Sequence, residues 1–291
     1  MMVKKAGCVN VANDLNLEVG GASGAFWACT NAVELTLAIL CINNFTEQSA
    51  DDFANSNPVK IWTALSLMFS LVALLPAITV YVIEHNKEKH SALRETSRYK
   101  ATAHINTFNL DVFGSAGALW FCCHAGIDEL IKLGLYVANN AEAQGFYESK
   151  IQPILQLIGI IAAIGGFILG AVATYGIEKQ TTSKPKRFIL NAHRFVTRVL
   201  GAPGVPWFNA YVAGRTIVAM IAQLSDLGSE FNATNSTDGI DPLAENGWKA
   251  GALLASVVML IIASFVHCST SRASQNREDA GAPLMNPMDN A

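Results

Sequence analysis

Charged residues are scarce in this chain of 291 residues, because Asp, Glu, Lys and Arg together make up only 15% of it. Hydrophobic residues make up 51%, and the mean hydropathy is positive. Soluble globular domains carry about a quarter of their residues as charges. The shortage of charge therefore argues against a soluble protein and predicts a protein of the lipid bilayer.

The chain also lacks the short motifs that carry known chemistry. It has no phosphate-binding loop, no Ser-His-Asp order, no paired zinc motif and no nucleic-acid-binding signature. Its six cysteines suggest no disulfide framework, and no Cys-x-x-Cys accompanies His124 as a metal-ligand set. The first residues contain no apolar core for a cleavable signal peptide. We therefore expect no enzymatic activity, no cofactor, no metal and no nucleic-acid partner.

Long apolar runs are present instead, each of about 21 to 28 residues, and roughly 20 suffice to cross a bilayer core as a helix. They are continuous, without the alternation that strands of a membrane barrel need. The sequence therefore predicts an all-α integral membrane protein with six transmembrane helices. The runs cover roughly residues 19–42, 61–83, 110–137, 153–177, 201–224 and 248–268.

The pattern Gly-x-x-Gly-x-x-Trp recurs along the chain at a spacing of about 90 residues, which is typical of an internal repeat. Its copies are Gly21, Gly24 and Trp27; Gly114, Gly117 and Trp120; and Gly201, Gly204 and Trp207. The segment 16–19, Asn-Leu-Glu-Val, also matches Asn-Leu-Asp-Val at 109–112. We expect three two-helix repeats, residues 14–84, 107–178 and 194–268, within a single membrane domain, 1–291. A cyclic arrangement of the repeats would give a pseudo-threefold bundle.

Small residues near the start of a membrane helix let a neighbouring backbone approach closely. The motif glycines are therefore predicted to mark contact seams between helices. A second ridge of small residues, at Ala162, Gly166, Gly170 and Thr174, lies on the fourth apolar run. The motif tryptophans lie deeper in the predicted membrane than the usual aromatic belt. Helix packing is the main role that the sequence predicts for these residues.

Polar residues recur at fixed positions relative to each motif tryptophan. One helical turn after the tryptophan stand Asn31, His124 and Tyr211, near the predicted midplane. About two turns after it stand Asp128 and Arg215, and in the first repeat Glu34 stands one position before the corresponding residue, Leu35. At the inner mouth, before the tryptophan, stand Glu18, Asp111 and Arg198. Because unpaired charges are costly in lipid, we expect Arg215 to pair with Asp128 or Glu34, and Arg198 to face Glu18 and Asp111.

Basic residues are unevenly distributed, since most of the 20 Lys and Arg lie in the two terminal tails and in segments 84–109 and 178–200. By the positive-inside rule, both termini of this multi-pass protein are expected to face the cytoplasm. Residues 184–200 have the pattern of an amphipathic helix on the inner face, with Lys184, Lys186 and Arg187 as an anionic-lipid site. A plain cytoplasmic linker helix is the alternative. The polar tail, 269–291, is expected to be disordered.

The function that these patterns favour is a small transporter or channel. In this hypothesis the polar midplane residues contact the substrate, and the charge pairs on either side act as gates. The alternative is a non-transporting structural or organising membrane protein, in which glycine seams drive helix packing and would also permit a homo-oligomer. A membrane-shaping or lipid-sensing protein is a third hypothesis, based on the segment 184–200.

Overall fold

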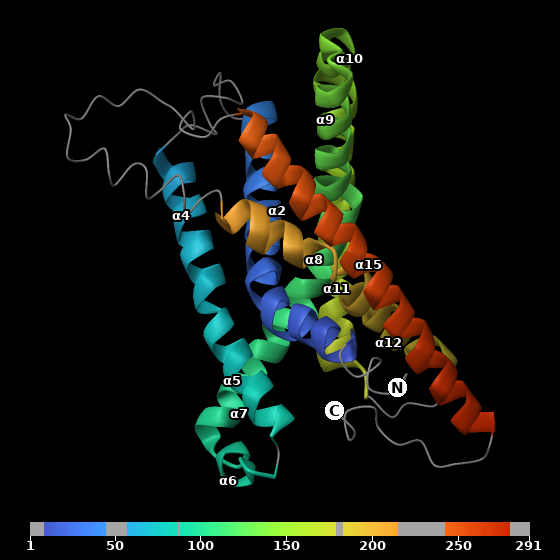
Figure 1. Cartoon of the computed structure of the whole chain (residues 1–291). Helices are drawn as coiled ribbons and strands as arrows, with labels where there is room; N and C mark the ends of the chain where they lie inside the picture. Colours follow the sequence, from blue (N-terminus) through green and yellow to red (C-terminus); the bar gives the residue numbers. More distant parts are fainter. Residues whose placement is uncertain (1–8, 45–56, 87, 179–182, 215–241, 280–291) are drawn as a thin grey trace.

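The computed structural model describes residues 9–44, 57–86, 88–178, 183–214 and 242–279, and within these ranges every regular element is a helix (Figure 1). Side chains are described for most of these residues, but not for 34–44, 57–61, 63, 64, 242–245 or 271–279. In chain order the first elements are η1 (Leu15–Gly20), α2 (Gly21–Asn44), α4 (Asn57–Val72), α5 (Leu74–His85) and α6 (Ser91–Arg94). Here η denotes a π-helical segment.

The second part of the chain forms one helical hairpin. Its first arm contains α7 (Ser97–Thr107), η2 (Phe108–Phe113), α8 (Gly114–Trp120), η3 (Phe121–Ala125) and α9 (Gly126–Ala138). Its second arm contains α10 (Ala141–Phe146), η4 (Tyr147–Ile151), α11 (Gln152–Ala171) and η5 (Val172–Gly176). The remaining elements are α12 (Lys184–Phe195), η6 (Val196–Leu200), α13 (Gly204–Pro206), η7 (Trp207–Ala213) and α15 (Pro242–Asp279). The helix α15 thus includes the beginning of the 269–291 tail.

Within the described ranges, four helices are long and apolar enough to cross a membrane: Leu65–His85, Ser97–Ala138, Ala141–Gly176 and Asn246–Thr270. They coincide with four of the six apolar runs and confirm the all-helical, membrane-spanning character of the chain. The other two runs, 19–42 and 201–224, extend into residues whose side chains or backbone lie outside the described part. A six-helix count therefore stays a prediction.

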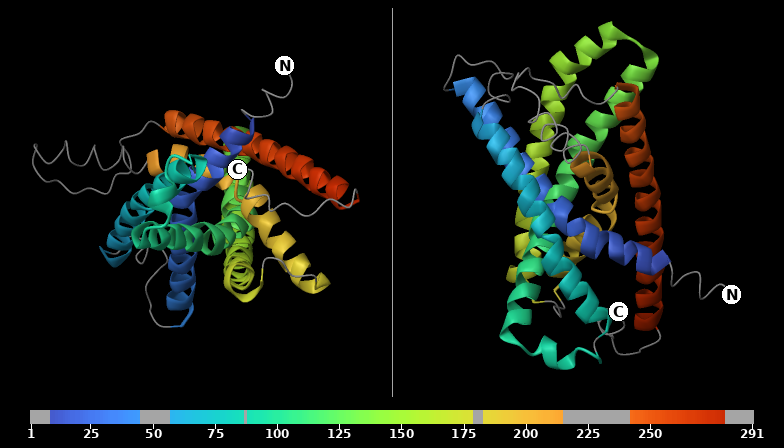
Figure 2. Two further views of the ribbon diagram at one scale, coloured as in Figure 1. Left: turned by 90° about the horizontal axis from the view of Figure 1, so that it is seen from below. Right: turned by 60° about the vertical axis from the view of Figure 1, so that its left-hand side comes forward.

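The hairpin turn is built by two asparagines. Asn139 has φ 50°, in the left-handed region that asparagine tolerates better than most residues, and it ends α9. The side chain of Asn140 then accepts a hydrogen bond from the backbone N–H of Ala143 and caps α10. The two arms have 42 and 36 residues, or about 63 and 54 Å of helix. A hydrocarbon core is about 30 Å thick, so the hairpin is much longer than one crossing, and its tip projects beyond α2 and α15 (Figures 1 and 2).

Glycines bring α11 against the first arm of the hairpin. A Cβ on Gly166 would lie 2.9 Å from Cα of Ala116, and one on Gly170 would lie 2.5 Å from the carbonyl oxygen of Asp111. No side chain larger than hydrogen fits at either position without a shift of backbone. Residues on the other side of α11 are apolar and exposed, which is the pattern of a face turned to lipid. They are Ile154, Leu157, Ile161, Ile164 and Ile168.

Candidate functional site

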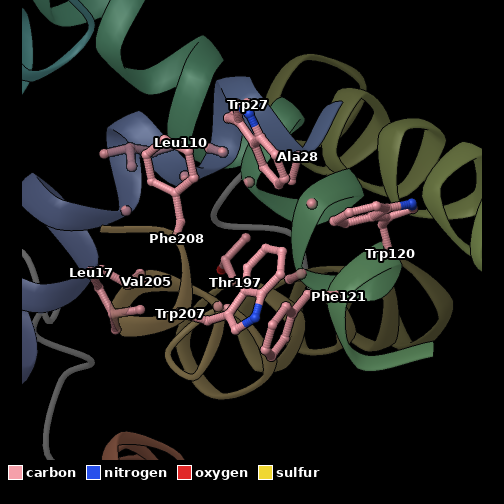
Figure 3. A pocket seen from close by; sticks show the side chains of 18 residues that line it. Leu17, Trp27, Ala28, Leu110, Trp120, Phe121, Thr197, Val205, Trp207 and Phe208 are labelled. Atoms are coloured by element: carbon pink, nitrogen blue, oxygen red, sulfur yellow. The ribbon is translucent and has the colours of Figure 1, made fainter. Parts of the chain in front are cut away.

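The three glycine motifs meet at one cavity between α2, α8 and the α13–η7 segment (Figure 3). Every glycine and every tryptophan of the three motifs lines this cavity, and its volume is about 60 Å³. The other lining residues are small or apolar, apart from Thr197, and none of them is charged. The sequence motif thus marks a place where three segments far apart in the chain come together.

One contact recurs at each of the three junctions around the cavity. The residue that follows a tryptophan packs on the second glycine of another motif. A Cβ on that glycine would lie 2.8, 3.5 or 3.6 Å from the nearest atom of the neighbour. The pairs are Ala28 on Gly117, Phe121 on Gly204, and Phe208 on Gly24.

The order of the contacts shows how the motif helices run. Ala25 faces Gly114 and Ala28 faces Gly117, so a step along one helix is matched by a step in the same direction along its neighbour. Val205 and Phe208 face Gly21 and Gly24 in the same way. The helices that carry the motifs are therefore parallel where they meet, and one end of the cavity corresponds to the N-terminal ends of all three motifs.

Asparagines join two of these junctions by hydrogen bonds from side chain to backbone. The side-chain amide of Asn109 donates to the carbonyl oxygen of Ala22 at 2.7 Å, and that of Asn16 donates to the carbonyl oxygen of Ala202 at 3.2 Å. The two asparagines occupy equivalent positions in the first two copies of the motif, but the sequence alone does not predict their hydrogen bonds to the neighbouring helix. In the third motif the corresponding residue is Val196, which has no side-chain donor.

A π-helical segment ends directly before the first glycine of each motif: η1 before Gly21, η2 before Gly114 and η6 before Gly201. A π-helical turn contains an extra residue and leaves part of the backbone hydrogen bonding displaced, and such turns are frequent at functional sites. Asn16 and Asn109 both lie inside these segments. Single-sequence periodicity gives no signal for such turns, and the sequence analysis did not predict them.

Aromatic rings form the wall of the cavity. Trp27 lies 6.0 Å from Trp120 and 5.6 Å from Trp207, measured between ring centroids, and Phe121 lies 5.4 Å from Trp207. All four side chains are buried. The indole nitrogens of Trp120 and Trp207 have no hydrogen-bond partner. The motif tryptophans therefore pack against other aromatic rings and also surround an open space.

The predicted midplane residues have different neighbours from one another. Asn31 donates its side-chain amide to the carbonyl oxygen of Trp27 in its own helix. His124 is buried, with its ring 5.5 Å from that of Trp120 and its Cγ 3.1 Å from where a Cβ on Gly159 would lie. Tyr211 lies below the ammonium group of Lys249, which is 5.3 Å from its ring centroid. None of these contacts, in the described part of the chain, joins the three side chains to one another.

Two ion pairs lie on the C-terminal side of the cavity. The carboxylate of Asp128 accepts a hydrogen bond from the hydroxyl of Tyr147 at 2.6 Å and pairs with Lys132 at 2.9 Å. Glu129 of α9 pairs with Lys249 of α15, also at 2.9 Å, and both side chains are largely buried. Arg215 and the side chain of Glu34 lie outside the described residues, so their predicted pairing with Asp128 stays a prediction. Sequence analysis did not identify Tyr147 or Lys249 as partners.

Charged residues also gather on the N-terminal side of the cavity. Burial raises the pKa of the Asp14 carboxyl, although Arg198 and His85 act in the opposite direction. Burial likewise raises the pKa of Glu18, with Asp14 adding to the shift and Arg198 opposing it. The charge of Arg198 thus acts on Glu18, and the predicted pairing of these two residues stays a prediction. The carbonyl oxygen of Asp111 is 3.0 Å from the ring nitrogen Nε2 of His193.

Comparison with known proteins gives no match to a family model, to a curated protein or to a solved structure. The class of protein therefore follows from the fold alone. Helices long and apolar enough to span a bilayer, with exposed apolar faces, are those of a membrane protein.

Proposed function

We propose that this chain is a small transporter or channel and that its path passes through the cavity lined by the three motifs. The observation that carries the proposal is that all the repeated glycines and tryptophans line this one cavity. Repeated residues that served only to pack helices in pairs would not need to share a space. In this proposal the three segments are repeats arranged with pseudo-threefold symmetry, because the same contact recurs at each junction.

Charged groups on both sides of the cavity support a gated path. Glu18 lies about nine residues before Trp27, and Glu129 lies about nine residues after Trp120, which is roughly 14 Å along a helix in each direction. Because the motif helices are parallel where they meet, these two groups lie on opposite sides of the tryptophans. The Glu129–Lys249 pair forms the outer gate in this proposal, and Glu18, Asp14 and Arg198 form the inner one.

Filling the cavity should stop transport. A leucine in place of Gly24 would extend towards Phe208 and into the cavity, since a Cβ on Gly24 would already lie 3.6 Å from the Cβ of Phe208. We expect the wild-type chain in proteoliposomes to conduct protons, small ions or small neutral solutes, measured with entrapped dyes and by light scattering. Gly24→Leu should reduce the flux at least ten-fold.

Gly251→Leu is the matched control, because a Cβ on Gly251 of α15 meets no atom within 4 Å. This variant should conduct like the wild type. If no version of the protein conducts any of these solutes, the transport proposal is wrong.

A non-transporting structural protein is the second candidate, and the dispersed positions of Asn31, His124 and Tyr211 favour it. A continuous polar path at the midplane would bring such groups together. In that case the cavity is a packing defect around bulky rings. Gly24→Leu would then change the melting temperature, and neither this variant nor the wild type would show flux. A homo-oligomer seen by native mass spectrometry would fit this candidate.

Anionic lipid is the partner we propose for α12. Lys184, Lys186 and Arg187 are exposed on this helix, and Phe188 beside them is 73% exposed. An exposed ring next to basic residues suits the headgroup region of a membrane, where each basic residue contributes about 1 kcal/mol of attraction to anionic lipid.

Replacing these three basic residues with glutamine should remove most of the rise in melting temperature that phosphatidylserine produces in detergent micelles. The double variant Lys89→Gln and Arg98→Gln changes exposed bases elsewhere and should keep that rise. An equal loss per charge removed, with the control losing about two thirds as much as the triple variant, would mean that α12 has no special role and that only total charge matters.

A further inference from the structure

The indole N–H of Trp207 is a hydrogen-bond donor without a partner in the wall of the cavity. Only 5% of Trp207 is exposed, and its Nε1 makes no hydrogen bond to any described residue. In Figure 3 this nitrogen lies among the lining side chains, near Thr197 and Phe121. The indole nitrogen of Trp120, which also has no hydrogen-bond partner in the described part of the chain, points away from these side chains in the same view. A buried donor left unsatisfied costs about 1–3 kcal/mol, and native proteins nearly always supply a partner. The partner of Trp207 is therefore a group that enters the cavity.

The other lining groups limit what this partner can be. The hydroxyl hydrogen of Thr197 is not available to a ligand, because it is donated to the carbonyl oxygen of His193 at 3.0 Å. The remaining lining side chains are aromatic, aliphatic or absent, as at the motif glycines, and no charged residue is among them. An ion would lose its hydration shell here without compensation, which is expensive. The wall thus selects an uncharged molecule with one acceptor atom.

The volume sets an upper limit on size. A cavity needs about 10–15 Å³ on this measure to hold one water molecule, so 60 Å³ accommodates a molecule of a few non-hydrogen atoms. Glycine at the six motif positions keeps the wall from closing, because side chains there would fill the space.

We propose that the cavity binds a small uncharged molecule with an apolar body and one oxygen acceptor, such as a short alcohol, and that Trp207 Nε1 donates to that oxygen. This inference rests on the proposed path and specifies the class of solute that uses it. The body of the solute packs between Trp27, Trp120 and Phe121. Water alone would satisfy the donor but would leave these aromatic faces without a matching partner.

2-Bromoethanol is a suitable probe, because it has the stated size and chemistry and its bromine quenches tryptophan fluorescence on contact. We expect saturable quenching of the full-length wild-type protein. Gly24→Leu, with the cavity filled, should show only the linear quenching that exposed tryptophans give. Bromoethane, which lacks the oxygen, serves as the matched probe without an acceptor.

The variant Trp207→Phe keeps a ring in the wall but removes the donor. We expect it to weaken the binding of 2-bromoethanol about five-fold, the ratio that one neutral hydrogen bond gives, and to leave the binding of bromoethane unchanged. Linear quenching in the wild type, or equal weakening for both probes, would overturn the proposal. If Trp207→Phe does not fold, a competition experiment on the wild type tests the proposal instead. A short alcohol without bromine should displace 2-bromoethanol, and the matching alkane should displace it less well. Any other result overturns the proposal.

The binding proposal and the transport proposal can be rejected independently of each other. Saturable quenching in a protein without flux would keep this binding site and reject the transporter. Flux in a protein that binds neither probe would keep the transporter and reject this class of solute.

Discussion

Replacing Gly166 with leucine is expected to prevent the protein from folding. A Cβ at this position would lie 2.8 Å from the carbonyl carbon of Ser115 and 2.9 Å from Cα of Ala116, both of them backbone atoms. Backbone in the middle of a helix cannot move aside as a side chain does, so α11 would have to separate from α8. Overpacking in a core typically costs about 1–3 kcal/mol for a methyl-sized change, and leucine adds three further carbons.

Size-exclusion chromatography of detergent-solubilised protein measures this effect, with Gly166→Leu expected in the void volume and Gly166→Ala expected to melt several degrees below the wild type. Gly165→Leu is an unusually close control. It changes the neighbouring residue of the same helix, where a Cβ meets no atom within 4 Å. Similar behaviour of Gly165→Leu and Gly166→Leu would show that α11 does not pack on α8 through Gly166.

The sequence predicted this seam because helix packing in membranes has a local signature. Small residues spaced one turn apart, such as Gly166 and Gly170, predict a close approach whatever the partner is. Long apolar runs predict spanning helices for a similar reason, since the bilayer imposes the same requirement on every helix. The structure places Gly166 against α8 and Gly170 against η2 and the start of α8, and four of the apolar runs form helices that are long enough to span.

Positions that depend on helix rotation could not be predicted in the same way. Counting from the motif tryptophans assumes an α-helix in every copy, but Phe121–Ala125 and Trp207–Ala213 are π-helical. A π-helical turn contains an extra residue, which changes the direction of the side chains in and after it relative to an α-helix. The count that places Asn31 on a face of its α-helix therefore does not fix the faces that His124 and Tyr211 occupy.

The partner of an intramembrane charge is equally hard to predict from one sequence. Spacing in the repeats pointed to Asp128 and an arginine, whereas the described ion pair between α9 and α15 joins the next residue, Glu129, to Lys249. Which of two adjacent carboxylates faces α15 depends on the rotation of α9 and on the angle between the helices. Neither quantity has a signature in the sequence.

Lys249→Met is expected to destabilise the protein strongly, because it leaves the carboxylate of Glu129 buried without its cation. The side chains of this pair are only 14% and 17% exposed. Removing one partner of a buried pair costs about 3–5 kcal/mol, since the remaining charge has lost its hydration without compensation. In a chain of this size that corresponds to a fall in melting temperature of roughly 10 °C. Thermal melts followed by intrinsic fluorescence in detergent measure it directly.

An exposed pair provides the control for this effect. Lys100 pairs with Glu95 at 3.0 Å, but the side chains are 62% and 81% exposed. Surface pairs are worth about 0–1 kcal/mol, so Lys100→Met should shift the melting temperature by no more than about 2 °C. If Lys249→Met were equally mild, the Glu129–Lys249 pair would be solvated, and its proposed role as a closed outer gate would fail.

The double variant Lys249→Met and Glu129→Met separates the cost of a lone charge from the loss of packing. Replacing both members of a buried pair with apolar residues of similar volume is often neutral, so most of the stability should return. A double variant as unstable as Lys249→Met would instead assign the loss to packing of the lysine on Tyr211, whose ring lies below the ammonium group. A folded double variant also tests the gate: if the pair closes the outer side of the path, its flux should exceed that of the wild type, because this ion pair no longer joins α9 to α15.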